Sequence, residues 1–220
     1  MGKPDLVLIE GYGTNSIILR GLIEFLEDYF TVHSFDLPGF IQDVEPLEQV
    51  TIANYVHYVK EQIEALQLDT YLIAGVSFGF LLANKVAADK KCEGVIAIEP
   101  YMNAQHLNFS TKKMLSTKIA VKAVTSLKLY DKIWHSKYFK KTLIKRGYPS
   151  NMITEILKDM NSREYFETGK LLVQHKETPV FARKPYALIV NLNDHVVNGR
   201  KTVKTFKENI QQLNIIYTNA

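Results

Sequence analysis

The sequence predicts an α/β protein in which a mostly parallel sheet is flanked by helices and interrupted by an all-helical insertion. Short apolar runs of strand type alternate with longer stretches whose apolar residues recur at helical spacing. This alternation stops at about residue 103 and resumes near residue 184, and the interval contains no clear strand. Strands separated by helix-length segments pair in parallel through right-handed crossovers. We therefore expect a core formed by residues 1–102 and 184–220, with residues 103–183 inserted as a helical, lid-like cap.

Six runs have the character of strands. The first, residues 6–10, reads LVLIE, and such a continuous apolar run is typical of a parallel strand buried on both faces. The other predicted strands are residues 31–36, 70–74, 94–98, 186–192 and 215–218.

The intervening stretches have helical periodicity. Ser16 precedes apolar residues at helical spacing, so we expect its hydroxyl to cap a helix over residues 17–30. The other predicted helices are residues 51–68, 78–89 and 200–213 in the core, with 114–133 and 152–159 among those of the insertion.

Length and composition exclude several classes of protein. The 220 residues are 46% hydrophobic and 23% charged, which suits one domain with an insertion and excludes a disordered chain. The apolar runs are much shorter than the roughly 20 residues of a membrane-spanning helix, and the first residues do not resemble a secretory signal. Cys92 is the only cysteine, which excludes an intrachain disulfide and a cysteine-based metal cluster. We expect a cytoplasmic protein without a metal or organic cofactor.

A basic segment stands out from this composition. The chain carries a net charge of +4, yet residues 112–146 contain eleven Lys or Arg and one acid, Asp131. The first interpretation is an amphipathic cap helix with a solvated lysine face, because apolar residues recur among the lysines at helical spacing. They are Met114, Leu115, Ile119, Val121, Val124, Leu127, Ile133 and Trp134. The alternative is attraction to an anionic substrate group or an anionic membrane surface, and we expect no nucleic-acid partner.

The strongest chemical signal is the pattern G-x-S-x-G at residues 75–79, formed by Gly75, Ser77 and Gly79. It follows a predicted strand and begins a predicted helix. A turn this tight strains the backbone at the serine, and the flanking glycines allow the neighbouring segments to approach closely. The serine hydroxyl is then presented at the carboxyl edge of the sheet, which favours a nucleophile over a packing turn.

With this turn, the chain resembles the α/β-hydrolase superfamily, in particular its capped serine hydrolases and esterases. Further motifs of the superfamily match in chain order over nearly the whole length. They are Glu10-Gly11-Tyr12-Gly13 after the first strand, Asp36-Leu37-Pro38-Gly39 after the second, and Asn193-Asp194 after the strand at residues 186–192. The predicted insertion lies where these enzymes carry a cap.

The resemblance implies a role for each of these positions. Ser77 would be the nucleophile, and Asp194 the acid that orients its base, unless Asp194 serves only as a turn residue. Glu99 is the rival acid, because it also ends a predicted strand. The backbone N–H groups of Tyr12 and Phe78 would form the oxyanion hole, leaving their side chains free to line the pocket.

Two positions depart from the superfamily. Its general base is a histidine after the last core strand, whereas this sequence ends at Ala220 before any histidine. We expect either a chain that lacks this closing segment or a protein without a standard triad. His195 adjoins Asp194, where neighbouring side chains tend to diverge, and His106, at the start of the cap, is the other candidate. The second departure is Glu10, where many members carry histidine. Its carboxylate would either bond backbone amides or disfavour an anionic intermediate.

These observations predict a serine hydrolase that acts on an ester, thioester or similar acyl bond through an acyl-enzyme. Six aromatic residues of the cap suggest a small apolar acyl or aromatic substrate. They are Tyr130, Trp134, Tyr138, Phe139, Tyr165 and Phe166. The alternatives are a catalytically inactive small-molecule binding protein, a truncated non-functional fragment of the enzyme, and a surface-binding module that uses residues 112–146. The oligomeric state is left open.

Overall fold

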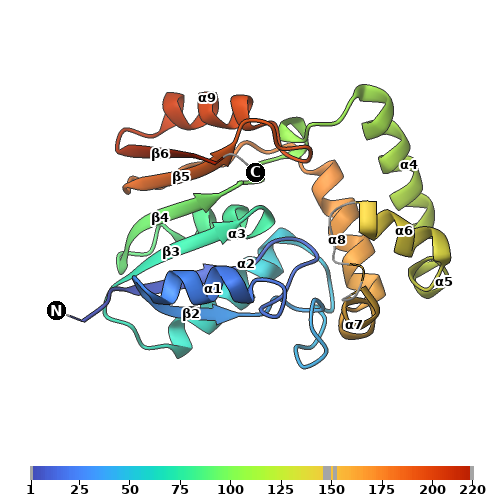
Figure 1. Ribbon diagram of the computed structural model, residues 1–220, viewed down its shortest axis with the longest axis horizontal. Helices are drawn as coiled ribbons and strands as arrows, with labels where there is room; N and C mark the ends of the chain where they lie inside the picture. The colour runs from blue at the N-terminus through green and yellow to red at the C-terminus, as the bar shows by residue number, and fades with distance from the viewer. Residues whose placement is uncertain (1, 146–149, 151–152, 219–220) are drawn as a thin grey trace.

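A computed structural model describes residues 2–145, 150 and 153–218. Within these residues one parallel sheet of six strands has the order β2-β1-β3-β4-β5-β6, with helices packed against it (Figure 1). The strands are β1 (Asp5–Ile9), β2 (Thr31–Phe35), β3 (Tyr71–Val76), β4 (Cys92–Ile98), β5 (Tyr186–Asn191) and β6 (Leu213–Thr218). The predicted fold class is confirmed.

The two faces of the sheet are covered differently. Helix α1 (Arg20–Glu27) buries Leu26 against Leu6, Leu8 and Ala74 on one face. On the other face lies the main core, which includes residues of α2 (Ile52–Ala65), α3 (Phe78–Val86) and α9 (Gly199–Asn209). Because alternate residues of a strand point to opposite faces, β1 contributes to both clusters.

Helix starts follow local capping, with one error in our expectation. Thr51 caps α2 by accepting a hydrogen bond from the N–H of Asn54 (3.1 Å). The predicted cap at Ser16 is wrong, because α1 begins at Arg20. The Ser16 N–H and hydroxyl instead donate to the two carboxylate oxygens of Asp36 (2.5 and 2.8 Å). Ser16 therefore bonds a residue that follows the next strand instead of capping a helix.

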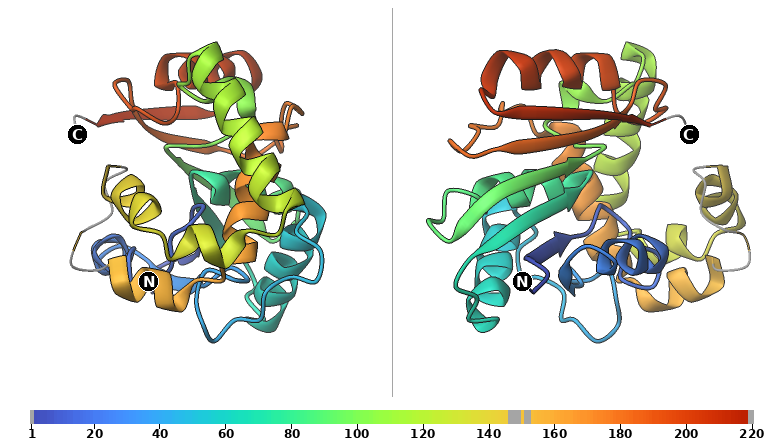
Figure 2. Two further views of the ribbon diagram at one scale, coloured as in Figure 1. Left: turned by 90° about the vertical axis from the view of Figure 1, so that its right-hand side faces the viewer. Right: turned by 60° about the vertical axis from the view of Figure 1, so that its left-hand side comes forward.

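Between β4 and β5 the described residues are helical, apart from connecting loops. The helices are η1 (Ala104–His106), α4 (Thr111–Ser126), α5 (Tyr130–Trp134), α6 (Lys137–Lys145), α7 (Ile153–Asp159) and α8 (Ser162–Gln174). We call residues 103–183 the insert. Most of its helices stand together beyond the carboxyl ends of the central strands (Figures 1 and 2). The helix predicted over residues 114–133 is divided into α4 and α5 at Lys128, whose φ is +51°.

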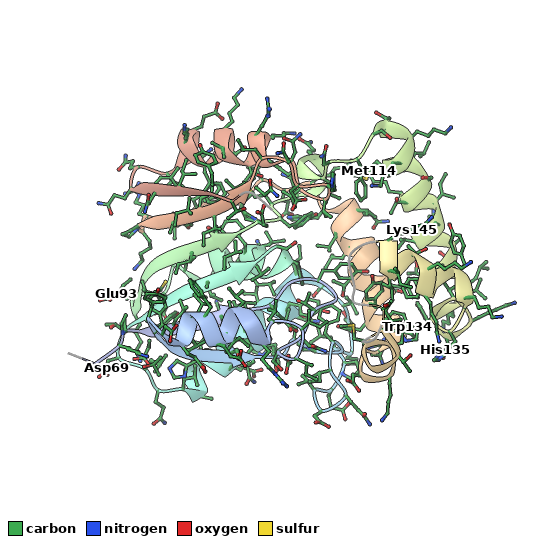
Figure 3. All side chains as sticks on the ribbon, in the orientation of Figure 1. Asp69, Glu93, Met114, Trp134, His135 and Lys145 are labelled. Atoms are coloured by element: carbon green, nitrogen blue, oxygen red, sulfur yellow. The ribbon has the colours of Figure 1, made fainter. Side chains whose placement is uncertain are left out.

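The insert has an apolar core of its own. Its members are Trp134, Phe139, Leu143, Ile153, Leu157, Met160, Tyr165 and Phe166. Figure 3 shows Trp134 on the insert, apart from the strands. Helix α8 connects this core to the sheet, because Leu172 at its other end belongs to the main core. Among the helices of the described ranges, none combines the length and apolar character that crossing a bilayer requires.

The expected amphipathic face on the basic segment is present in part. Met114, Val121 and Val124 are half-buried on α4. Leu115, Ile119 and Leu127, which the pattern assigns to the same apolar set, are 59%, 61% and 66% exposed. Apolar side chains therefore occupy both the inner and the solvent-facing sides of this helix.

Candidate active site

Ser77 lies at the turn between β3 and α3, in a backbone conformation rare for a residue with a side chain. Its φ and ψ angles are 49° and −111°. Three backbone hydrogen bonds hold this conformation. The Ser77 N–H donates to the carbonyl of Ile98 (2.9 Å), and the Ser77 carbonyl accepts from the N–H groups of Phe80 (3.1 Å) and Tyr101 (3.0 Å). The serine is thus fixed at the carboxyl edge of the sheet.

The two flanking glycines are required by close backbone contacts. A Cβ atom on Gly75 would lie 2.5 Å from the backbone N and Cα of Phe80. A Cβ atom on Gly79 would lie 2.3 Å from the carbonyl oxygen of Glu10. Side chains at either position would force α3 away from the sheet. The geometry that the G-x-S-x-G pattern predicts is therefore present.

Ser77 is half-buried, and its hydroxyl makes no hydrogen bond with any residue of the described ranges. The loop that follows β1 lies beside it. A Cβ atom on Gly11 would be 3.5 Å from the Cβ of Ser77 and 3.2 Å from the carbonyl oxygen of Val76. This contact brings the Tyr12 backbone into the neighbourhood of Ser77. The Phe78 N–H opens α3, where backbone donors have no acceptor within the helix.

The side chains of Tyr12 and Phe78, which we expected to be free to line the pocket, are engaged in other contacts. Phe78 is fully buried, with its ring 5.3 Å from that of Tyr55. The Tyr12 hydroxyl donates to the carbonyl of Tyr165 (2.9 Å), and the two rings lie 4.7 Å apart. Tyr12 therefore attaches the loop after β1 to α8.

The insert aromatics are likewise occupied. Trp134, Phe139, Tyr165 and Phe166 are buried in the insert core, and the indole N–H of Trp134 donates to the carbonyl of Leu157 (2.8 Å). Of the remaining two, Tyr130 donates a hydrogen bond from its hydroxyl to Glu167 (2.7 Å), and Tyr138 is 81% exposed. Four of the six aromatic residues from which the sequence suggests an apolar acyl or aromatic substrate are therefore packed inside the insert.

Residues that sequence reasoning missed hold the loop after β1. The Thr14 hydroxyl donates to the carbonyl of Gly11 (3.0 Å) and accepts from its N–H (2.9 Å). The side chain of Asn15 donates to the carbonyl of Phe40 (3.1 Å), which connects this loop to the turn after β2. The available signal was the Thr-Asn-Ser run, since such side chains often bond the nearby backbone of a turn.

Asp194 lies just beyond β5, at the predicted edge of the sheet. Its Oδ1 accepts hydrogen bonds from the N–H groups of Val196 and Val197, the second at 2.7 Å. This arrangement is the Asx-type turn that was the alternative to a catalytic role. The carboxylate is half-buried and therefore accessible to a further partner.

Glu99 lies at the end of β4 in a different environment. Its φ is +42°, and its Oε1 accepts from the N–H of Asn191 (2.6 Å). Its Oε2 is buried and has no hydrogen-bond partner among the described residues. Burial raises the pKa of Glu99 to about 7, an effect opposed by the Asn191 N–H and reinforced by the charge of Asp194. The two candidate acids are thus electrostatic neighbours.

Glu10 is buried directly before the loop that contains Tyr12. Its Oε1 accepts from the N–H of Leu37 (2.7 Å), so the carboxyl group does bond a backbone amide. Burial, followed by the charge of Asp36, raises its pKa well above the ordinary value despite that hydrogen bond. Protonation of Glu10, which this shift favours, would remove the charge that opposes an anionic intermediate.

The structure places no histidine of the described ranges in hydrogen bond with Ser77. His106 bonds Asn103 (3.0 Å) and Thr205 (3.2 Å), and burial lowers its pKa to about 4. His195 is exposed beside Asp194, where the sequence suggested that the two side chains diverge. The remaining histidines lie elsewhere. His33 contacts Asp5, His57 contacts Glu61, His135 is exposed, and the ring of His175 packs near that of Tyr101.

Neither a metal-type cluster nor the groove described next adds to this site. Within the part of the chain that the structure describes, no group of three or more His, Cys, Asp or Glu residues could hold a metal ion. A groove of about 410 Å³ is lined by Lys60, Tyr71, Lys85 and Asp89. These residues lie at the amino-terminal edge of the sheet, opposite to Ser77. The chemistry therefore has to be argued from the turn itself.

Comparison with known proteins agrees with this fold. The sequence model of the family described as "alpha/beta hydrolase fold" matches residues 4–198. A pimeloyl-(acyl-carrier protein) methyl ester esterase of Shewanella oneidensis is 37% identical over 97 residues, which are 43% of this chain and 34% of the relative. An abhydrolase domain-containing protein of Caenorhabditis elegans is 29% identical over 105 residues, which are 45% of this chain and 24% of the relative. The matches span about a third or less of these relatives.

Solved structures match the chain over its whole length. A hydrolase from Oleispira antarctica has a TM-score of 0.75 and 17% identity, covering 100% of this chain and 84% of the other. An esterase from Exiguobacterium antarcticum has a TM-score of 0.74 and 14% identity, covering 100% of this chain and 85% of the other. At such identities the likeness shows the fold alone.

Proposed function

The chain belongs to the α/β-hydrolase fold family, and from this premise we propose that it is a serine hydrolase that cleaves an ester, thioester or similar acyl bond. The observation that carries the proposal is the strained turn at Ser77. It holds an unbonded, half-buried hydroxyl beside the loop after β1 and at the start of a helix. The named activity of the Shewanella esterase supports the ester class, without identifying the substrate.

In this proposal the Ser77 oxygen attacks the carbonyl carbon, and the carbonyl electron pair moves onto oxygen. The N–H groups of Phe78 and Tyr12 stabilise the resulting oxyanion. Collapse of the intermediate expels the alcohol or thiol, and water then hydrolyses the acyl-enzyme. A base accepts the Ser77 proton and returns it to the leaving group. We propose that Asp194 orients this base, with Glu99 as the alternative acid. We also propose that the insert acts as the cap.

A fluorophosphonate probe tests this proposal directly, because its phosphorus forms a covalent bond with an activated serine oxygen as fluoride leaves. We expect labelling of the full chain and none of Ser77→Ala. The matched control is Ser116→Ala, an exposed serine on α4 that should label like the wild type. An ester panel from acetyl to dodecanoyl tests the apolar acyl class, with at least a ~10³-fold loss expected in Ser77→Ala. Equal labelling of wild type and Ser77→Ala, or none of either, overturns the proposal.

A non-catalytic binding protein is the second candidate. It is favoured by one observation, the absence of a histidine hydrogen-bonded to Ser77 within the described ranges. Saturable binding of a non-hydrolysable ester analogue by both wild type and Ser77→Ala, without turnover or labelling, would select this candidate. Turnover that depends on Ser77 would eliminate it.

A further inference from the structure

We propose that the solvent-facing side of α4 binds an anionic lipid surface. This side, called the α4 face below, consists of Lys112, Leu115, Ile119 and Lys122, all of which are exposed. The proposal does not depend on chemistry at Ser77. It explains why apolar side chains that the amphipathic interpretation expected to be buried are exposed on α4.

The α4 face has a regular arrangement. Leu115 and Ile119 are one helical turn apart, so they form a single apolar strip. At 100° per residue, Lys112 lies on one side of this strip and Lys122 on the other. The half-buried Met114, Val121 and Val124 occupy the opposite side of the helix, which packs against α8. The strip is therefore not needed to attach α4 to the insert.

The charged residues of helix α4 have one sign. Helix α4 contains four lysines and no acidic residue. Asp131, the single acid within residues 112–146, accepts a hydrogen bond from the hydroxyl of Ser162 (2.5 Å). An apolar strip flanked by lysines matches the boundary of an anionic bilayer, because leucine and isoleucine enter the acyl region while lysine reaches the headgroups.

The composition favours lipid over a protein or nucleic-acid partner. Protein interfaces are enriched in aromatic residues and arginine and depleted in lysine, whereas the α4 face has two lysines and neither arginine nor an aromatic residue. Nucleic acid would use the lysines but gain nothing from Leu115 and Ile119. Viewed from the insert side, α4 stands in front of the sheet (Figure 2, left). A bilayer bound there would meet the insert before the sheet.

The test is sedimentation of the full chain with vesicles of phosphatidylcholine, with or without phosphatidylglycerol. We expect binding to the anionic vesicles, at least tenfold weaker binding to neutral ones, and release at high salt. Leu115→Ser with Ile119→Ser should weaken binding about tenfold at unchanged charge. Lys112→Gln with Lys122→Gln should weaken it about 25-fold, roughly fivefold per lysine.

Matched controls change the same residue types elsewhere. Lys204→Gln with Lys207→Gln removes two exposed charges from α9, and Phe25→Ser removes a 59% exposed apolar side chain from α1. Both should bind as the wild type does, and circular dichroism checks folding. Failure to bind anionic vesicles, or equal losses in the controls, overturns the proposal. Binding to an acidic protein or to DNA without binding to vesicles also overturns it. Ser77→Ala should bind vesicles normally, which separates this outcome from that of the proposed chemistry.

Discussion

Ser77 keeps a positive φ of 49° because α3 begins in direct contact with the first strand, and Gly79 permits that contact. In Gly79→Ala the new Cβ would lie 2.3 Å from the backbone oxygen of Glu10, which has no flexible end that can move away. We expect a loss of at least about 3 kcal/mol in the free energy of unfolding, measured with urea. Gly21→Ala in α1 is the control, because open space surrounds Gly21 and alanine favours a helix. A Gly79→Ala protein as stable as this control would contradict the steric argument.

Glu99 makes stability depend on pH. Its pKa is about 7 in the folded protein, compared with an ordinary value of 4.5. As pH rises between these values, the unfolded chain releases the proton while the folded chain keeps it, so folding becomes less favourable. Below pH 4.5 the effect is absent, and above pH 7 it is complete. When the pH is raised from 4.5 to 8, we expect the free energy of unfolding of Glu99→Gln to increase by about 1–2 kcal/mol relative to that of the wild type, allowing for solvent screening.

Urea unfolding at both pH values provides the measurement for Glu99. Glu93→Gln, at an exposed position of the same strand, is the control. If Glu99→Gln and Glu93→Gln respond to pH in the same way, Glu99 is not the group that titrates.

At the scale of elements, a buried polar contact joins α2 to α8. The Tyr55 hydroxyl lies 2.7 Å from Glu164 and 2.9 Å from Thr168, and all three side chains are inaccessible to water. Tyr55→Phe leaves the Glu164 carboxyl without this partner, so we expect a loss of about 2 kcal/mol in the free energy of unfolding. Tyr29→Phe, in which the tyrosine is 59% exposed, should change stability by less than about 0.5 kcal/mol. Denaturant titration of both variants decides between a structural contact and an incidental one.

The elements show which parts of the fold could be predicted from sequence. Strand and helix order follows from apolar spacing, which is local information, and the G-x-S-x-G turn carries its own glycines. The first helix start was wrong because Asp36, directly after β2, bonds Ser16, and no local pattern encodes that partner. Likewise, helical spacing groups Ile119 with the other apolar residues of its helix, but it does not indicate which side of the helix packs against another element.

At the scale of the whole molecule, the candidate site was predictable where it depends on the carboxyl edge of the sheet. Ser77, Asp194 and Glu99 all end strands of one parallel sheet, so their neighbourhood follows from topology. The positions of the Tyr12 and Phe78 side chains did not follow. They are determined by α8 and α2, elements far away in sequence, and periodicity contains no information on such contacts.

The main core and the insert core meet through few side chains. The contact between these two cores should determine whether the molecule unfolds as one unit. Tyr12 packs against both cores, and a Cβ atom on Gly169 of α8 would lie 2.7 Å from the Tyr12 hydroxyl. Trp134, the single tryptophan, reports on the insert core, whereas circular dichroism reports on all elements. In the wild type we expect the two urea transitions to coincide, because α8 belongs to both parts.

Gly169→Val should separate these two transitions. The valine displaces Tyr12 and weakens its hydrogen bond to Tyr165 while leaving the insert core intact. We expect the Trp134 fluorescence midpoint to fall below the circular dichroism midpoint by about 0.5 M urea. Gly21→Val places the same residue in α1, where open space surrounds it, and should leave the transitions coincident. Coincident transitions in Gly169→Val would mean that contacts other than Tyr12 couple the two cores, such as those of Tyr55 with α8.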